Sequence, residues 1–353
     1  MGLNTLIMVN NLPDPEMDLA DRIEVTERMD QSVAFSIHYS VDVCGGDVSR
    51  LRESRFDPDT TITILVPEEN NLMNCLVKGP VNSQQIHLEH GGAGSWMQVG
   101  GADTSIIMGR EFRSDIWNSL TDSEVVMAIA SRPEYRLIPD AERTNTRHLE
   151  MAHVLVQRSN DLQFVRRLAR RNGFHFWVSC NPLGIETAHF KKPELNGSPV
   201  VDLVINQDGC NMQNLAIRWD TERPTTVENR QLDMSNKNSL NHGTSTQVQN
   251  VLGGRSLRQI QGLGVHSTHI AVPSDNGNIS GSEAVLMEAD WFINASCRTT
   301  YRQIKKVIHL YDIINVVGAG SRHSGKYMVS GVRHTIDETA HQMEIELIRN
   351  GWD

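Results

Sequence analysis

Apolar and polar residues alternate along much of the chain, which is the pattern of strands that bury one face. In 33–39 every second residue is apolar, and in 343–347 the apolar positions alternate with Glu344 and Glu346. We expect further strands at 22–26, 60–66, 73–78, 84–89, 96–99, 200–205, 215–219, 295–304, 307–310, 313–317, 326–334 and 342–349. Glycine and proline separate the runs of the first hundred residues, which favours a barrel or a sandwich there.

The segment 155–178 carries the most complete set of local signals. Ser159 or Asn160 can cap a helix, because a short polar side chain accepts from the free N–H groups of the first turn. Apolar residues then recur at helical spacing up to Gly173, which suits a left-handed C-cap. Alternation after Gly173 predicts that the chain leaves the helix as a strand.

Several other segments carry weaker signals. Thr121 and Glu124 form a capping box for a helix of about ten residues ending near Pro133, and Ser282 caps a helix that reaches about residue 292. The glycine-rich run 318–325 lacks GxGxxG spacing and precedes a strand, so it predicts a tight β-hairpin turn rather than a phosphate-binding loop. We expect 1–20 to be a loosely held arm and the polar stretch 222–264 to be a long loop.

Composition narrows the class of protein. The formal net charge of −10 argues against nucleic acid as the main partner, because phosphate binding requires a basic face. No apolar run approaches the roughly 20 residues of a membrane span, and we expect no signal peptide. The cysteines form no CxxC pair, which predicts neither a zinc site nor a disulfide framework and fits synthesis in the cytoplasm. They are Cys44, Cys75, Cys180, Cys210 and Cys297.

The residues offer no convincing active site. The run His87–His90 contains histidines and a glutamate but lacks HExxH spacing, so we expect surface polar residues there. For His148 and His153 we expect satisfied or exposed side chains. No GxSxG elbow is present, which disfavours a serine hydrolase. We therefore predict no catalytic residues, no metal and no cofactor.

Arginines gather at the end of the helix in 155–178, where the negative end of the helix dipole favours cations. We interpret them as a solvated face or as salt-bridged contacts to another chain. Together with two residues of the 318–325 turn they make up the candidate inter-subunit or partner contacts. These candidates are Arg166, Arg167, Arg170, Arg171, Arg322 and His323.

The order of segments resembles the late control D family of phage tail proteins, which form the baseplate hub of contractile tails and of phage-derived injection systems. The N-terminal half of the VgrG spike proteins of type VI secretion is similar. The run Q-R-x-x-D-x-x-F-x-R-R-L-A-x-x-N-G-F at 157–174 is the most specific match. Supporting matches are VGGADTSIIMGREF at 99–112 and VGAGSRHSGKYMVSGVRHTID at 317–337.

The resemblance implies an α+β, β-rich fold with two tail-tube-like β-barrel domains and a small mixed α/β insert. We place the first barrel, with its arm, at 1–108, the insert at 109–198 and the second barrel at 199–353. The implied function is that of a structural baseplate hub without enzymatic activity. Such a hub is a homotrimer that acts as a symmetry adaptor between the sixfold tail tube and a threefold spike.

The implied partners are a tail tube protein of the Hcp type, a spike and other baseplate proteins. Since complete spike proteins continue beyond the position of Asp353, we expect the spike to be a separate polypeptide. The protein would be made in the cytoplasm and assembled into a phage tail or an injection-system particle. Two alternatives remain open, a tail-associated β-rich hydrolase acting on cell walls and a carbohydrate-binding module.

Overall fold

The computed structural model describes residues 5–41, 50, 53–68, 72–90, 92–149, 154–232, 239–244, 249–261, 267–270 and 279–353. Of the residues considered above, Cys44 and His153 lie outside these ranges, as do residues 1–4 and parts of 222–264.

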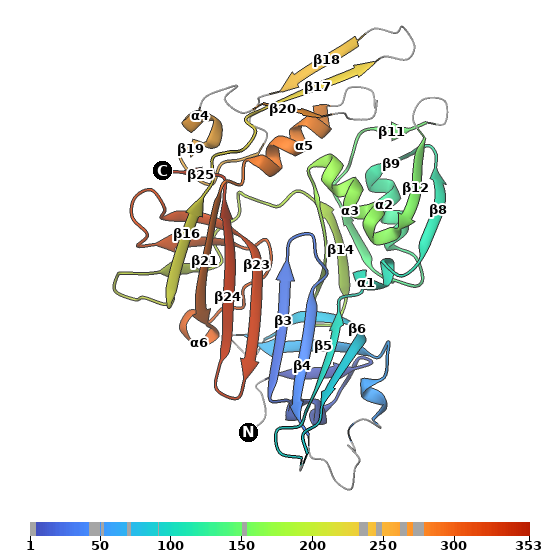
Figure 1. Ribbon diagram of the computed structural model, residues 1–353, viewed down its shortest axis with the longest axis vertical. Coiled ribbons are helices and arrows are strands. Elements are labelled where there is room, and N and C mark those ends of the chain that lie inside the picture. Colours follow the sequence, from blue (N-terminus) through green and yellow to red (C-terminus); the bar gives the residue numbers. More distant parts are fainter. Residues whose placement is uncertain are drawn as a thin grey trace.

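The chain is β-rich, and a 13-stranded sheet runs through most of its length (Figure 1). The N-terminal half of this sheet contains β1 (Leu6–Val9), β2 (Leu12–Pro13), β3 (Arg22–Arg28), β4 (Ala34–Ser40), β5 (Thr61–Pro67), β6 (Met73–His87) and β7 (Trp96–Ala102). The C-terminal half contains β15 (Asp202–Val204), β16 (Asn214–Trp219), β21 (Ile293–Thr300), β22 (Ile313–Val317), β23 (Gly325–Asp337) and β24 (His341–Arg349). Short helices η1 (Pro15–Leu19), η3 (Ser54–Phe56) and α6 (Tyr301–Ile304) accompany these strands.

The two halves join where β23 pairs with β3 in antiparallel register, from Gly331 opposite Arg28 to Asp337 opposite Arg22. The order along the sheet is β16-β21-β24-β23-β3-β4-β7-β6-β5-β1-β2, with β22 on β23 and β15 on β22. A β-bulge between Val329 and Gly331 interrupts the pairing of β23 with β24. The connection 318–324 joins the antiparallel strands β22 and β23, so the predicted hairpin is confirmed, although its connection is longer than a tight turn.

The insert packs beside the long sheet as a small mixed unit (Figure 1). Its helices are α1 (Ser105–Met108), α2 (Asp122–Ala130) and α3 (Asp161–Asn172). Its strands are β8 (Phe112–Trp117), β9 (Leu120–Thr121), β10 (Ile138–Ala141), β11 (Arg147–His148), β12 (Leu155–Asn160), β13 (His175–Cys180) and β14 (Glu186–Lys191). Strands β10, β14 and β13 form one sheet, while β8 pairs with β12 and β9 with β11.

Both predicted helices of the insert are confirmed together with their caps. The Asn160 side chain accepts from the backbone N–H of Gln163 at 2.8 Å, and Gly173 ends α3 in the left-handed region at φ 66°. In α2, Thr121 and Glu124 form the reciprocal capping box. These ends depend on residues within a few positions of one another, and for that reason the sequence revealed them.

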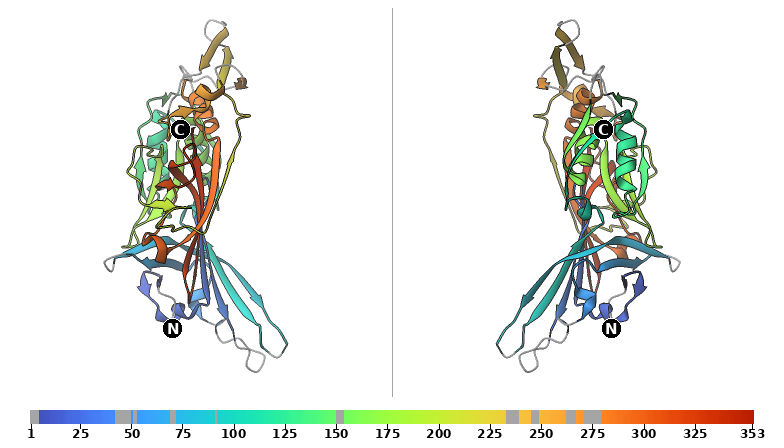
Figure 2. Two further views of the ribbon diagram at one scale, coloured as in Figure 1. Left: turned by 90° about the vertical axis from the view of Figure 1, so that its left-hand side faces the viewer. Right: turned by 90° about the vertical axis from the view of Figure 1, so that its right-hand side faces the viewer.

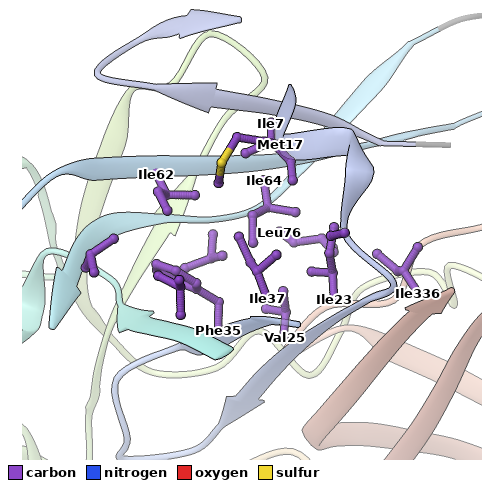
Figure 3. Packing of buried hydrophobic residues seen from close by; sticks show 14 of the residues in the cluster. Ile7, Met17, Ile23, Val25, Phe35, Ile37, Ile62, Ile64, Leu76 and Ile336 are labelled. Carbon is purple, nitrogen blue, oxygen red and sulfur yellow. The ribbon is translucent and has the colours of Figure 1, made fainter. Parts of the chain in front are cut away.

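The N-terminal arm was predicted wrongly. Strand β1 pairs with β5, and Ile7 and Met17 are completely buried. Asp14 caps η1 and receives the Arg55 guanidinium at 2.6 Å. Figure 3 shows Ile7 and Met17 packed against Ile62 and Ile64 of β5. The segment is held because it completes a sheet edge and fills the core beneath it.

The polar stretch 222–264 was also predicted wrongly as a loop in its described parts. It contributes β17 (Thr226–Leu232), β18 (Ser239–Thr244), β19 (Arg255–Ser256) and α4 (Leu257–Gln261). Strand β17 pairs with β18 and with β20 (Ser267–Ile270), and β19 pairs with β25 (Gly351–Trp352). Helix α5 (Ile279–Ala289) lies against β17, and the group occupies the end of the molecule opposite the N-terminus (Figure 1).

Three further strand predictions need correction. Segments 73–78 and 84–87 belong to the single strand β6, whose last residues pair with β7 in an exposed extension that projects from the body of the molecule (Figure 2). The predicted strand 295–304 ends at Thr300, and its last four residues form helix α6. Segment 307–310 is not a strand, although Val307 and Ile308 are buried. Burial of an irregular segment produces the same apolar run as a strand does, so the pattern could not separate the two.

Three large hydrophobic clusters fill the molecule. One lies in the N-terminal half and includes Ile336 from β23, the second lies in the C-terminal half, and the third lies in the insert around Phe164 and Phe176. Figure 3 shows Ile336 reaching the first cluster beside Ile23. The domain limits at 108 and 198 stay predictions.

We expect Ile7→Ala to lower the free energy of unfolding by about 2–5 kcal/mol, because a buried aliphatic side chain leaves a cavity. The measurement is urea denaturation followed by circular dichroism. Leu12→Ala is the matched control, since Leu12 lies in the same segment but is 71% exposed. Equal stability of both variants would contradict the packing of this segment.

Candidate functional site on the long sheet

One face of the long sheet is polar across both halves. In β21 every second residue is exposed, from Asn294 to Arg298, and β3, β23 and β24 continue the pattern. The registers place these residues in cross-strand rows; one row contains Arg298, Glu344, Arg333 and Thr26. The opposite face carries the hydrophobic clusters of the two halves, and a smaller cluster with Met328 and Ile348 covers one end of the polar side. The polar face therefore spans β21, β24, β23 and β3, where the two halves meet.

Opposite charges alternate along these rows. Arg298 pairs with Glu344, Arg333 with Glu24 at 2.7 Å, and Arg28 with Glu346 at 3.0 Å. The last two pairs each link the N-terminal to the C-terminal half. Exposed pairs of this kind each contribute roughly 0–1 kcal/mol, so they shape the charge pattern of the face more than its stability.

Gly331 lies between the partners of one of these pairs. It stands opposite both Arg28 and Glu346 in the sheet. A Cβ at this position would lie 3.0 Å from a carboxylate oxygen of Glu346 and 3.2 Å from Cγ of Arg28. The absence of a side chain therefore leaves room for the two long side chains to meet across β23.

A charged network lies buried beneath the same junction. Glu27 of β3 is 5% exposed, and its carboxylate is 2.9 Å from Nδ1 of His309 and accepts from the backbone N–H of Leu310 at 2.9 Å. His309 Nε2 is 2.8 Å from Oδ1 of Asn74. His334 and His341 extend the network, with 2.9 Å between Nδ1 of the first and Nε2 of the second. The network links β3, β23, β24, β6 and the segment before β22.

Within the network, Glu27 and His309 form an ion pair, whereas His334 and His341 are neutral at pH 7. Burial opposes ionisation of Glu27, yet neighbouring His309 holds the pKa of this carboxyl well below its usual range. Burial would lower the pKa of His309, but Glu27 raises it to about 9. Burial and the neighbouring histidines lower the pKa of His334 and bring that of His341 to about 3. Because its hydrogen bonds join residues of different strands and of the segment before β22, we interpret the network as structural.

The structure places the predicted arginines in different surroundings. Arg171 binds the buried carboxylate of Asp122 at the start of α2, and Arg166 donates to Ser32 at 3.4 Å, which links α3 to the N-terminal half. Burial lowers the pKa of Arg166. Arg167 and Arg170 are exposed, and Arg170 lies 3.6 Å from Asp30. Arg167 donates to the Val156 carbonyl at 3.4 Å, so each of the four arginines has a contact within the chain.

Arg322 and His323 lie apart from these arginines, on the β22–β23 connection. The Arg322 guanidinium is 5.0 Å from the ring centroid of Trp352, and the His323 carbonyl accepts from the Tyr327 hydroxyl at 2.8 Å. Buried Arg349 holds this connection by donating to the carbonyl of Ser324 at 2.9 Å. The six candidates therefore form no single site, and their roles in contacts to other chains stay predictions.

The histidines weighed as metal ligands have ordinary partners. His148 is buried 2.7 Å from Asp122, as expected for a satisfied side chain, and His87 lies 3.4 Å from Glu89 at the surface. Within the described ranges, no group of three or more histidine, cysteine, aspartate or glutamate side chains is arranged to hold a metal.

Sequence reasoning missed the buried network completely. Its members come from positions near 27, 74, 309, 334 and 341, and no local spacing links them. The polar face did leave a signal, because Glu344 and Glu346 alternate with apolar residues. The alternation does not reveal which strands are neighbours in the sheet, so the cross-strand rows of charged residues could not be predicted.

Known structures of tail proteins share this fold. A tail protein from Neisseria meningitidis MC58 has a TM-score of 0.67 at 13% identity, covering 99% of this chain and 97% of that one. The 43 kDa tail protein of prophage MuSo2 from Shewanella oneidensis gives 0.65 at 11%, covering 99% of each. The E. coli c3393 protein, a type VI secretion component with structural similarity to the T4 tail proteins gp27 and gp5, gives 0.61 at 11%, covering 97% and 76%. The predicted resemblance is thus confirmed at the level of the fold.

The family assignment comes from sequence. The family model described as the Alg8 N-terminal domain matches residues 23–338, which is most of the chain. The chain belongs to this family. A search among curated proteins gives no match. In the part of the chain that the structure describes, no helix combines the length and apolar character needed to cross a membrane.

The histidines of the network predict a loss of stability in acid. Below about pH 6.5 histidines of the unfolded chain bind protons, whereas folded His341 stays neutral down to a pKa of about 3. The unfolded state then binds more protons, so the free energy of unfolding decreases as the pH is lowered across this window. His309 acts in the opposite sense: its contribution is complete below about pH 6.5 and is lost as the pH rises through its folded pKa of about 9.

We expect His341→Gln to flatten the decline of stability between pH 6.5 and 3, measured as the urea midpoint at a series of pH values. His87→Gln, at an exposed position, is the matched control and should keep the wild-type slope. If His341→Gln also kept that slope, His341 would not be the group that titrates differently on folding.

Proposed function

We propose that the protein is a structural component of a phage tail or of a phage-like contractile injection system, and specifically its baseplate hub. The observation that carries the proposal is the fold itself: two halves continuous through β23–β3, with an insert beside them, matched over nearly the whole chain by tail proteins. Likeness to the type VI component supports the same role.

The proposed hub is a homotrimer that works as a symmetry adaptor. Three chains, each contributing two β-rich halves, present six such units around one axis, which suits a sixfold tail tube of the Hcp type. The same trimer offers threefold symmetry to a spike, with other baseplate proteins around it. Closed point-group symmetry is the usual state of such assemblies. The protein would reside in the assembled particle.

We further propose that the polar face of the long sheet lines the axial channel of this hub. Its arginines and glutamates pair with one another along the rows, so the face is hydrated without a strong net charge of either sign. Such a lining gives a passing polypeptide no large apolar patch to bind. The role is mechanical, since the hub transmits force from tube to spike and needs no covalent chemistry.

We expect the purified chain to have a mass about three times its 39.6 kDa in light scattering. Electron microscopy should then show threefold particles, and the trimer should bind a tube protein and a spike protein from the same source. A chain that stays monomeric and binds neither would overturn the proposal. Turnover of peptidoglycan by the pure protein would instead favour the hydrolase alternative.

Charge reversal separates a channel lining from an interface. Arg298→Glu replaces an exposed side chain of the polar face. If the face lines a channel, the variant keeps the trimeric mass, because exposed pairs contribute only roughly 0–1 kcal/mol. Arg158→Glu, at an exposed position of β12 in the insert and outside the long sheet, is the matched control. Dissociation of the Arg298→Glu trimer alone would place the face in a contact between chains.

A further inference from the structure

Two cysteines far apart in the sequence meet between the insert and the N-terminal half. Cys75 lies on β6 and is 3% exposed, and Cys180 is the last residue of β13 and is half-buried. Strands β6 and β13 are in contact, although they belong to different sheets. These two cysteines are far apart in the sequence and come close only in the folded chain. A search for CxxC motifs therefore could not find them.

Both side chains line the same cavity of about 170 Å³, together with Trp177, His309 and Leu310. The Cys180 thiol donates to the backbone carbonyl of Asn181 at 3.3 Å, and its proximity, together with burial, raises the pKa of Cys75. Of the other described cysteines, Cys297 lies in the hydrophobic cluster of the C-terminal half and Cys210 is exposed. Cys75 and Cys180 are therefore placed differently from either.

We propose that Cys75 and Cys180 form a disulfide that cross-links the insert to the N-terminal half when the protein meets an oxidising thiol–disulfide environment. The half-buried Cys180, as thiolate, attacks one sulfur of a small-molecule disulfide and expels one thiol. Cys75 then loses its proton and attacks Cys180 Sγ, which expels the second thiol. One disulfide of the reagent is reduced to two thiols, and the two protein thiols are oxidised to one disulfide.

The cross-link would add a covalent bond to a boundary that is held by non-covalent contacts. Lys78 donates to the Gly184 carbonyl at 2.7 Å, the Thr104 hydroxyl donates to Glu186 at 2.8 Å, and Arg166 of α3 donates to Ser32. A bond between Cys75 and Cys180 would close a long loop containing β7 and most of the insert, the case in which cross-linking constrains the unfolded chain most. The reduced protein can thus fold first and gain rigidity later.

The test uses the full chain and oxidised glutathione. After incubation, free thiols are alkylated and the protein is digested without reductant. Mass spectrometry should then find one peptide pair joining Cys75 to Cys180, which separates on reduction. Cys180→Ser should abolish the pair, and Cys210→Ser, at the exposed cysteine, should keep it. The melting temperature should rise on oxidation in the wild type and in Cys210→Ser but not in Cys180→Ser.

Cys210 also serves as an internal control for the oxidant. If Cys210 carries glutathione while Cys75 and Cys180 are still alkylated as free thiols, the proposal is overturned. A peptide joining either cysteine to Cys44 or Cys297 would overturn it as well. Because Cys180 lies at a strand end, its serine variant should fold even if Cys75→Ser does not. The result is independent of whether the chain is a hub.

Discussion

The pairing of β23 with β3 is the constraint on which the rest of the structure depends. It joins strands some three hundred residues apart in sequence and turns two halves into one sheet. Ionic contacts reinforce it on both faces: exposed Arg28–Glu346 and Arg333–Glu24 on one side, buried Glu27–His309 on the other. The relative position of the halves is therefore fixed by backbone hydrogen bonds, and no flexible linker separates them at this point.

The two faces of the junction are stabilised by different physics. On the polar face water screens every charge, so partners can be exchanged at small cost. On the buried face the carboxylate of Glu27 is tolerated only because it accepts from His309 and from the backbone N–H of Leu310. Removing one buried partner leaves the other as an unpaired charge away from water, whereas the partner of a removed exposed residue is still hydrated. The surface of the sheet can accordingly vary more freely in sequence than its interior.

Sequence alone predicted the elements whose signals are local. The Asn160 cap, the Thr121 capping box and Gly173 gave both insert helices correctly, and alternation gave most strands. It failed for Ile7 and Met17, because their burial depends on β5, some fifty residues later. It could not show that Arg171 of α3 binds Asp122 within the chain. Contacts between segments that are distant in sequence produce no local motif. The contact of Glu27 with His309 and the proximity of Cys75 to Cys180 are two examples.

The β-bulge at Val329–Gly331 limits which insertions and deletions β23 can accept during evolution. Before the bulge Tyr327 and Val329 face the core, and after it Val332, His334 and Ile336 do so, so the bulge shifts the parity of the strand by one. A single strand thereby keeps one side inward while it serves two hydrophobic clusters. Loss or gain of one residue in β23 would turn Arg333 inward and His334 outward. A change of one residue in the length of this strand is thus acceptable only where a bulge absorbs it, which ties the evolution of one half to that of the other.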